Sequence, residues 1–169
     1  TEWEKLFAQG KKKLSYIDLT ILLTNNCQMG CVYCFEGAKM KNNIQKATIS
    51  HIIDFLRTQV GTCKKLRVTW FGGEPLLVYY RLKELSLALM EFCNSHQIEY
   101  KADITTNGFA LNEARCHEMV SQLQVKRYII TIDGLAATHD VRRPLKNGES
   151  SFSTIWHNIE LLVDTGAWV

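Results

Sequence analysis

Alternating and continuous stretches of apolar residues along the chain predict four β-strands. In residues 16–23 every second side chain is apolar, which is the period of a strand with one buried face. Three later stretches are rich in β-branched and aromatic residues. They cover residues 66–71, 99–106 and 127–132, and each runs directly into a glycine-containing turn.

Apolar residues at helical spacing follow every predicted strand. The predicted helices cover residues 49–60, 82–93, 116–123 and 155–163. Thr48 and Asn112 are suitable caps for the starts of the first and third helices, and Gly166 is expected to end the fourth. Four strand–helix units without a break in composition predict a parallel α/β sheet, in a (βα) barrel, a partial barrel or a doubly wound arrangement.

The residues that follow the strands are unusual, and in parallel folds they gather on one rim. They are a cysteine-containing loop, Gly72-Gly73-Glu74-Pro75, Thr106-Asn107-Gly108 and Thr131-Ile132-Asp133-Gly134. Residues 167–169 look like the opening of a fifth strand, so we expect a core that is truncated after about four βα units. We divide the chain into an amino-terminal extension, residues 1–15, and an incomplete core domain, residues 16–169.

Composition narrows the class of protein. The chain has 169 residues, of which 46% are hydrophobic and 22% charged, so it is expected to form a globular domain rather than a disordered segment. Its apolar runs are far shorter than the ~20 residues of a membrane span, and no secretory signal begins the sequence. A net charge of +3 gives no support for nucleic-acid or membrane binding.

Three of the six cysteines lie close together, as Cys27-Gln-Met-Gly-Cys31-Val-Tyr-Cys34. Thiolates at this spacing can converge on one metal centre. A structural zinc site needs a fourth ligand, for which His51 and Cys63 are the nearest candidates. A [4Fe-4S] cluster held by three thiolates instead keeps one iron open for another molecule.

The other three cysteines are isolated in the sequence. Cys93 and Cys116 fall on apolar helix faces, where a free cysteine behaves as a small hydrophobic residue. Cys63 has no assignment from its position alone. The uneven spacing of all six favours reduced cysteines in the cytoplasm over a framework of disulfides.

These motifs together resemble the radical S-adenosylmethionine (SAM) superfamily. The cysteine loop and the Gly-Gly-Glu-Pro sequence match its cluster and methionine motifs. Thr106-Asn107-Gly108 and the segment from Thr131 to Arg143 are similar to the branch of anaerobic sulfatase-maturating and other SPASM-type peptide-modifying enzymes. The resemblance covers roughly residues 16–166.

The resemblance implies a parallel (βα) partial barrel of radical SAM type. It implies a [4Fe-4S] cluster on Cys27, Cys31 and Cys34, with S-adenosylmethionine bound to the open iron. Reductive cleavage of S-adenosylmethionine would give a 5′-deoxyadenosyl radical, which removes hydrogen from a substrate. The cofactors carry this chemistry, and the protein positions them.

The resemblance also assigns residues to the methionine end of S-adenosylmethionine. Gly72 and Gly73 let the backbone approach the ligand, and backbone carbonyls or Glu74 accept from the methionine ammonium. Arg143 corresponds to the arginine that binds the carboxylate, since a guanidinium pairs with it in two hydrogen bonds. The adjacent Arg142 is either a substitute for it or a solvated surface residue.

Two further residues are expected near the nucleoside. Thr131 occupies a position where the family usually has a serine that contacts the ribose. Tyr33 lies either beside the adenine or packed over the cluster. No catalytic acid, base or radical-quenching residue is assigned.

Polar residues near the strand ends also have ordinary structural explanations. Asn107 and Asp133 each precede a glycine and suit turns. His139 and Asp140 are neighbours in sequence and rarely face one another, so a structural turn is preferred over an acid–base pair.

The preferred function is hydrogen abstraction from a peptide or protein in oxidative maturation or crosslinking, and this part alone is expected to lack activity. The implied partners are the substrate and a flavodoxin- or ferredoxin-like electron donor. One alternative is a radical SAM enzyme that acts on RNA or a small metabolite. Another is a non-catalytic domain that binds a metal or a partner.

Overall fold

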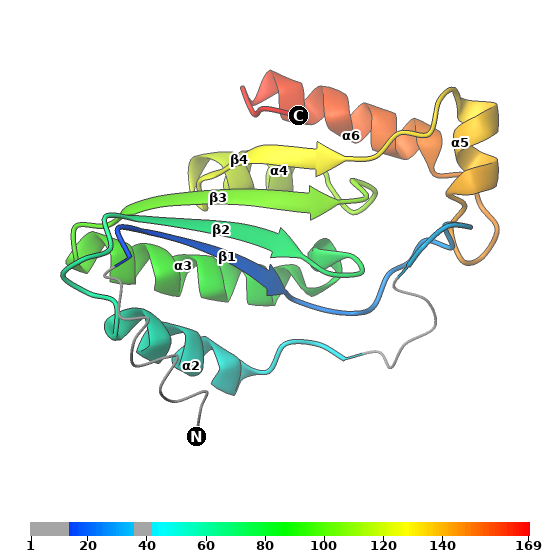
Figure 1. Cartoon of the computed structure of the whole chain (residues 1–169). Helices are drawn as coiled ribbons and strands as arrows, with labels where there is room; N and C mark the ends of the chain where they lie inside the picture. Colours follow the sequence, from blue (N-terminus) through cyan, green and yellow to red (C-terminus); the bar gives the residue numbers. More distant parts are fainter. Residues whose placement is uncertain (1–13, 36–41) are drawn as a thin grey trace.

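A computed structural model describes residues 14–35 and 42–169 of the chain (Figure 1). The expected amino-terminal extension, residues 1–15, lies almost entirely outside the described residues. The strands are β1 (Tyr16–Leu22), β2 (Lys65–Phe71), β3 (Glu99–Thr106) and β4 (Val125–Ile130). The helices are α2 (Lys46–Arg57), the short 3₁₀ helix η1 (Pro75–Val78), α3 (Tyr79–Ser95), α4 (Glu113–Ser121), α5 (Ala136–Arg142) and α6 (Phe152–Asp164).

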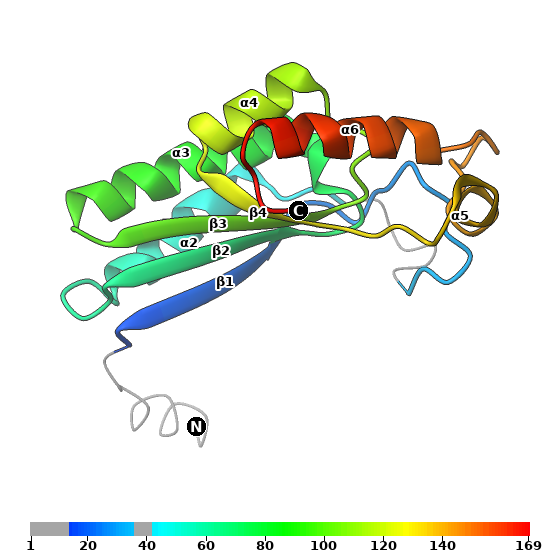
Figure 2. The same ribbon diagram turned by 90° about the horizontal axis from the view of Figure 1, so that it is seen from above.

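The four strands form one sheet in the order β1-β2-β3-β4, and every neighbouring pair is parallel. A doubly wound sheet would reverse its strand order at a switch point. This sheet does not, and α2, α3, α4 and α6 cover one side of it (Figure 2). The chain therefore has the predicted parallel (βα) partial-barrel arrangement.

The predicted start of a fifth strand is confirmed at Trp168, which pairs with Arg127 in parallel. The N–H of Tyr128 donates to the Trp168 carbonyl at 2.8 Å, and the Trp168 N–H donates to the Lys126 carbonyl at 2.9 Å. This last segment thus lies along the free edge of β4.

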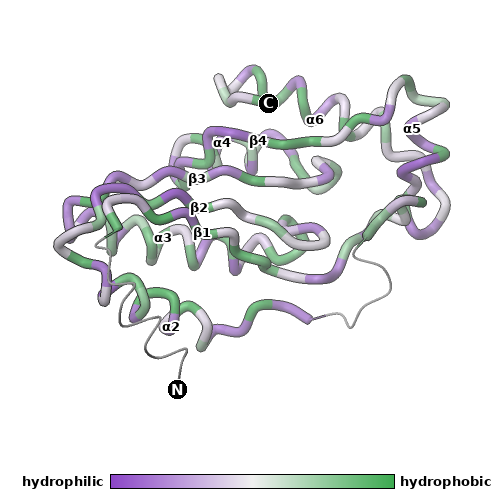
Figure 3. The backbone as a smooth tube through the Cα atoms, viewed as in Figure 1, coloured by the Kyte–Doolittle hydropathy of each residue, from purple (hydrophilic) through white to green (hydrophobic). Residues whose placement is uncertain are grey.

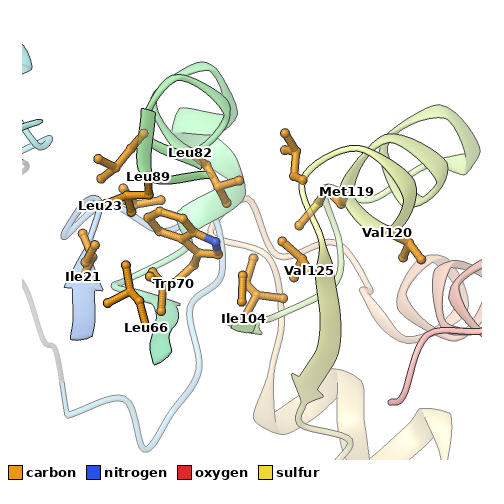
Figure 4. Close-up of a cluster of buried hydrophobic side chains, with 14 of the residues drawn as sticks. Ile21, Leu23, Leu66, Trp70, Leu82, Leu89, Ile104, Met119, Val120 and Val125 are labelled. Atoms are coloured by element: carbon orange, nitrogen blue, oxygen red, sulfur yellow. The ribbon is translucent and has the colours of Figure 1, made fainter. Parts of the chain in front are cut away.

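The main core lies between the sheet and its covering helices. Apolar and polar residues are mixed along each strand (Figure 3), because alternate side chains point to opposite faces. Trp70 of β2 is fully buried among Leu82 and Leu89 of α3 and Ile104 of β3 (Figure 4). Burial of apolar side chains of this size stabilises each by about 1.5–3 kcal/mol, so this layer holds the strand ends in fixed positions.

The opposite face of the sheet carries a row of polar residues. Thr20, Thr69, Asp103 and Arg127 lie side by side in the strand register. The Asp103 carboxylate accepts from Arg127 at 2.7 Å and lies 3.0 Å from the Nε of Arg67. Barrel interiors that are packed solid use bulky apolar side chains here, whereas the charged members of this row pair with one another or with Arg67.

Two of the three predicted helix ends are confirmed. The Asn112 side chain accepts from the Arg115 N–H at 3.0 Å, and Gly166 follows α6 with a φ of +75°. The Thr48 cap is wrong, because α2 begins at Lys46 with Gln45 as its N-cap residue. The preceding Ile44 donates its N–H to the Leu23 carbonyl at 2.8 Å, and this contact after β1 brings the start of the helix forward.

The last part of the chain differs from the expected pattern in two places. β4 begins at Val125 rather than residue 127, and its buried residues are Val125 and Tyr128. The α5 helix was not predicted, and its residues His139 and Asp140 were expected in a structural turn. Leu135 and Val141 are exposed, and His139 is the buried residue of this helix.

Within the described residues, no helix is both long and apolar enough to cross a membrane.

Candidate functional site

A cavity of about 200 Å³ lies at the carboxyl ends of the strands and contains nearly all the expected site residues. Its lining consists of Cys27, Met29, Cys31, Tyr33, Cys34, Phe35, Phe71, Gly72, Gly73, Thr105, Thr106, Asn107, Thr131 and Arg143. Figure 1 shows why they meet: the arrowheads point to one end of the sheet, where the segment after β1 runs beside α5. A larger surface hollow, of about 530 Å³, lies around Cys93 and Tyr100 at the other end of β3 and holds none of these residues.

The three clustered cysteines are free thiols around this one cavity. Among the residues that the structure describes, no three His, Cys, Asp or Glu side chains converge on a position for a single metal ion. A cubane cluster takes each cysteine on a different iron, and what the structure shows is that all three thiols line the same cavity. A mononuclear zinc site would need four ligands on one ion.

The two candidate fourth ligands for zinc lie elsewhere. His51 faces a groove between β1 and α2. Cys63 is buried in the main core, and its thiol contacts the Lys65 carbonyl at 3.3 Å. The donor set at the cavity is therefore three thiols without a nearby fourth ligand among the described residues.

Burial raises the pKa of the Cys27 thiol, and hydrogen bonds to its sulfur oppose that effect. The sulfur accepts from the Met29 N–H at 3.4 Å and from the Asn107 side-chain amide at 3.6 Å. Burial also raises the pKa of Cys31, while the nearby positive charge of Arg143 lowers it. Such donors stabilise a thiolate and tune the potential of a cluster bound to it.

Gly72 and Gly73 line the cavity, but close packing of backbone explains why both are glycine. Gly72 has a φ of +138°, and a Cβ there would lie 2.3 Å from the Thr24 carbonyl oxygen. A Cβ on Gly73 would lie 2.6 Å from the Asn26 carbonyl oxygen. The turn after β2 thus needs glycine in order to pack against the segment that leads into the cysteine loop.

Glu74 is fully buried and does not line the cavity. Its carboxylate accepts from the Leu76 N–H at 2.9 Å, and from the Thr106 hydroxyl and Asn107 N–H at 2.7 Å each. Burial raises the pKa of Glu74, and these three donors oppose the rise. The observed task of this side chain is to join the end of β2 to the end of β3.

The structure separates the two adjacent arginines. Arg143 is buried, lines the cavity and donates to the Tyr33 hydroxyl at 2.7 Å, while its Nε has no hydrogen-bond partner in the part of the chain that the structure describes. A buried donor without a partner is costly, so this guanidinium is suited to bind an acceptor in the cavity. Arg142 instead donates to the Asp133 carboxylate at 2.9 Å and stacks 5.2 Å from the Tyr33 ring centre.

Thr131 directly follows β4 and lines the cavity, as does Tyr33 with 45% of its surface exposed. Four lining residues had no expected role at the site: Met29, Phe35, Phe71 and Thr105. The positions of Phe71 and Thr105 at the ends of strands could have identified them, because that rim was already predicted to hold the site.

His139 and Asp140 each have a structural contact, as expected. His139 accepts from the Asp133 N–H through Nδ1 at 3.3 Å. Asp140 accepts from the N–H groups of Ser151 and Phe152, at 2.9 Å each, and so caps the start of α6. Both residues therefore fix the segment that presents Arg143.

Comparison with known proteins supports the same interpretation. The family model described as the Radical SAM superfamily matches residues 21–169. An uncharacterized protein of Methanocaldococcus jannaschii is 31% identical over 79% of this chain and 44% of its own length. The serine-type anaerobic sulfatase-maturating enzyme of Klebsiella aerogenes is 27% identical over 80% of this chain and 34% of its own. The GTP 3',8-cyclase of Clostridium acetobutylicum is 36% identical over 69% of this chain and 35% of its own length.

Solved structures share the fold. Native anSMEcpe with bound AdoMet and Kp18Cys peptide has a TM-score of 0.76 at 20% identity, over 90% of this chain and 42% of its own. BtrN in complex with AdoMet and 2-DOIA has a TM-score of 0.56 at 20% identity, over 92% of this chain and 55% of its own. The chain thus spans between a third and somewhat more than half of the proteins it matches.

Proposed function

The chain belongs to the radical SAM superfamily, and on that premise we propose that residues 16–169 form the amino-terminal part of its catalytic core. In this proposal Cys27, Cys31 and Cys34 hold a [4Fe-4S] cluster. The observation that carries it is the cavity at the strand ends, which is lined by three free thiols and by the buried Arg143, whose Nε has no partner among the described residues.

The other residues around the cavity would bind S-adenosylmethionine. Arg143 would pair with the methionine carboxylate, and the backbone of Gly72 and Gly73 would receive the ammonium. The Thr131 hydroxyl would contact the ribose, and the Tyr33 ring would lie near the adenine. When bound, the cluster and S-adenosylmethionine supply the electron and the 5′-deoxyadenosyl radical that removes a hydrogen atom.

Glu74 has a supporting role in this proposal. Since its oxygens already accept three internal hydrogen bonds, the methionine ammonium is left to the backbone carbonyls of the glycine turn. Glu74 keeps that turn at the correct distance from β3. This changes the expectation that its carboxylate contacts the ligand.

We propose a peptide or protein as the substrate. Sulfatase-maturating enzymes are among the relatives, and a structural neighbour has a bound peptide. The polar row from Thr20 to Arg127, on the sheet face opposite the core, contains hydroxyl groups that can donate to and accept from amide groups. We propose a flavodoxin- or ferredoxin-like protein as the electron donor and, because such clusters are sensitive to oxygen, a reducing cytoplasm as the location.

Anaerobic reconstitution with iron and sulfide tests the cofactor assignment. We expect about four irons per chain in the full-length wild-type protein, and 5′-deoxyadenosine after addition of dithionite and S-adenosylmethionine. Cys31→Ala should lose the cluster, whereas Cys63→Ala, which removes a buried thiol outside the cavity, should retain it. A single zinc per chain, or full iron content in Cys31→Ala, would refute the assignment.

A small-molecule substrate is the second candidate, and the GTP 3',8-cyclase relative favours it. The two candidates differ in what the reconstituted full-length protein binds. A substrate peptide should enhance formation of 5′-deoxyadenosine in the first case. If a nucleotide enhances formation of 5′-deoxyadenosine and no peptide does, the substrate is a small molecule.

A further inference from the structure

The cysteine loop, residues 27–34, is paired with a segment more than 100 positions later in the chain. This segment, Arg142–Lys146, is called the strap below. The Gly30 N–H donates to the Pro144 carbonyl at 2.7 Å, and the Val32 N–H donates to the Arg142 carbonyl at 3.0 Å. The Lys146 N–H donates to the Gln28 carbonyl at 2.9 Å, with Met29 and Leu145 opposite each other in an antiparallel bridge.

Buried side chains also join the loop to the strap. Met29 and Leu145 are buried together with Ile155 of α6, in a small core separate from the main one. Cys27 and Cys31 pack against this core. Two of the three cluster thiols are therefore placed by a contact between the loop and the strap.

Arg142 contacts the end of the loop, at Tyr33 beside Cys34. Its Nε donates to the Asp133 carboxylate at 2.9 Å, and its guanidinium stacks over the ring of Tyr33. Tyr33 precedes Cys34 and accepts a hydrogen bond from Arg143. Through Arg142, the end of β4 is thus connected to the aromatic residue between the second and third cysteines.

The strap itself is anchored at both ends. The Ser151 hydroxyl donates to the Arg143 carbonyl at 2.7 Å, and Asp140 caps α6 on the other side of the strap. Lys146 donates from Nζ to the Cys27 carbonyl at 2.6 Å. The strap is consequently a fixed surface, against which the cysteine loop lies.

We propose that the strap is a positioning element, which holds the cysteine loop in its cluster-binding shape before a cluster is bound, and that Arg142 is its main positioning residue. This inference rests on the proposed function of the three cysteines. Ordering a loop costs conformational entropy, and a loop that is already ordered avoids this cost when it binds its ligand. The backbone of the strap and the Arg142 side chain would therefore favour assembly of the cluster by ordering the loop, whereas Arg143 of the strap lines the cavity itself.

Hydrogen exchange of the full-length protein without cluster tests the proposal directly. The amides of Gly30 and Val32 donate into the strap, so both should be protected in the wild type. Arg142→Gln removes the ion pair and the stacking at a half-exposed position, and should speed exchange of these amides about three- to fivefold. Arg142→Lys keeps the charge but loses the planar group. Its amide exchange rates at Gly30 and Val32 should lie between those of the wild type and of Arg142→Gln.

Arg57→Gln is the matched control, because Arg57 forms a comparable exposed ion pair with Asp54 on α2. It should leave exchange in the loop unchanged. In reconstitution, Arg142→Gln should take up iron more slowly than Arg57→Gln, and the wild-type protein should load fully.

The outcomes separate this inference from the proposed function. If wild-type protein loads a cluster, and Arg142→Gln matches it in loop exchange and iron uptake, the strap has no positioning role. Rapid exchange of Gly30 and Val32 in the wild type would also overturn it. If the wild type shows protected amides but binds no iron, the proposed function fails while the pairing of loop and strap stands.

Discussion

Glu74→Gln tests whether the acidic residue of the glycine turn acts through structure or through ligand contact. The side chain is fully buried, and three donors meet its two oxygens. A glutamine replaces one acceptor with an N–H₂ group, which faces a donor already in place. One buried N–H is left without a partner, and the remaining hydrogen bonds lose their charge.

The expected cost follows from these contacts. A hydrogen bond to a charged group contributes about 1.5–3 kcal/mol, and an unsatisfied buried donor costs about 1–3 kcal/mol. We therefore expect a loss of about 3 kcal/mol in the free energy of unfolding. For a domain of this size each kcal/mol lowers the melting temperature by about 2–4 °C, which corresponds to about 6–12 °C.

Thermal unfolding of the protein without cofactors measures this effect. Glu84→Gln is the control, because Glu84 is a partly exposed residue that pairs with Arg81, and such pairs contribute at most about 1 kcal/mol. If Glu74→Gln melts with the wild type but binds S-adenosylmethionine more weakly, the structural argument is refuted and the carboxylate contacts the ligand.

Three other changes have definite expectations. In an unfolding titration, Gly72→Ala should lower the free energy of unfolding by more than about 3 kcal/mol, because its Cβ would meet the Thr24 carbonyl oxygen. The control is Gly61→Ala, where φ is also positive but the space is open. It should lower the free energy of unfolding by only about 1 kcal/mol. Burial first, and then the charge of Arg143, lowers the pKa of His139, so its contribution to stability is complete above about pH 6.5 and is lost as the pH falls through the folded value. A His139→Gln variant should show a flatter stability profile below that pH, and an unchanged profile would show that another group titrates. Arg143→Gln should weaken binding of S-adenosylmethionine to the reconstituted protein by about 1.5–3 kcal/mol, and an unchanged affinity in calorimetry would remove its assigned role.

The sequence alone predicted most of the strands and helices and the place of the candidate site at the strand ends. Strands and helices depend on local periodicity, so β1, β2 and β3, together with the Asn112 cap, could be predicted from short stretches. The three cysteines could be identified because their spacing lies within one loop. The rim could be predicted because parallel strands all end on the same side.

Only the tertiary structure showed which of the candidate residues line the cavity and which have contacts elsewhere. Arg142 and Arg143 are neighbours with the same side chain, and the burial of one and the exposed ion pair of the other separate them. The α5 helix has no apolar period, and it is held by the buried contact of His139. Glu74 could not be assigned from a turn motif, because its partners lie on β3.

The pairing of the cysteine loop with the strap could not be predicted from the sequence, because its partners are distant along the chain. Its hydrogen bonds join residues such as Gly30 and Pro144, and no local pattern in either segment indicates a partner so far along the chain. The two segments meet because the sheet brings the ends of β1 and β4 to one side. Local sequence specifies each element, whereas contacts between distant elements exist only after the strands have assembled.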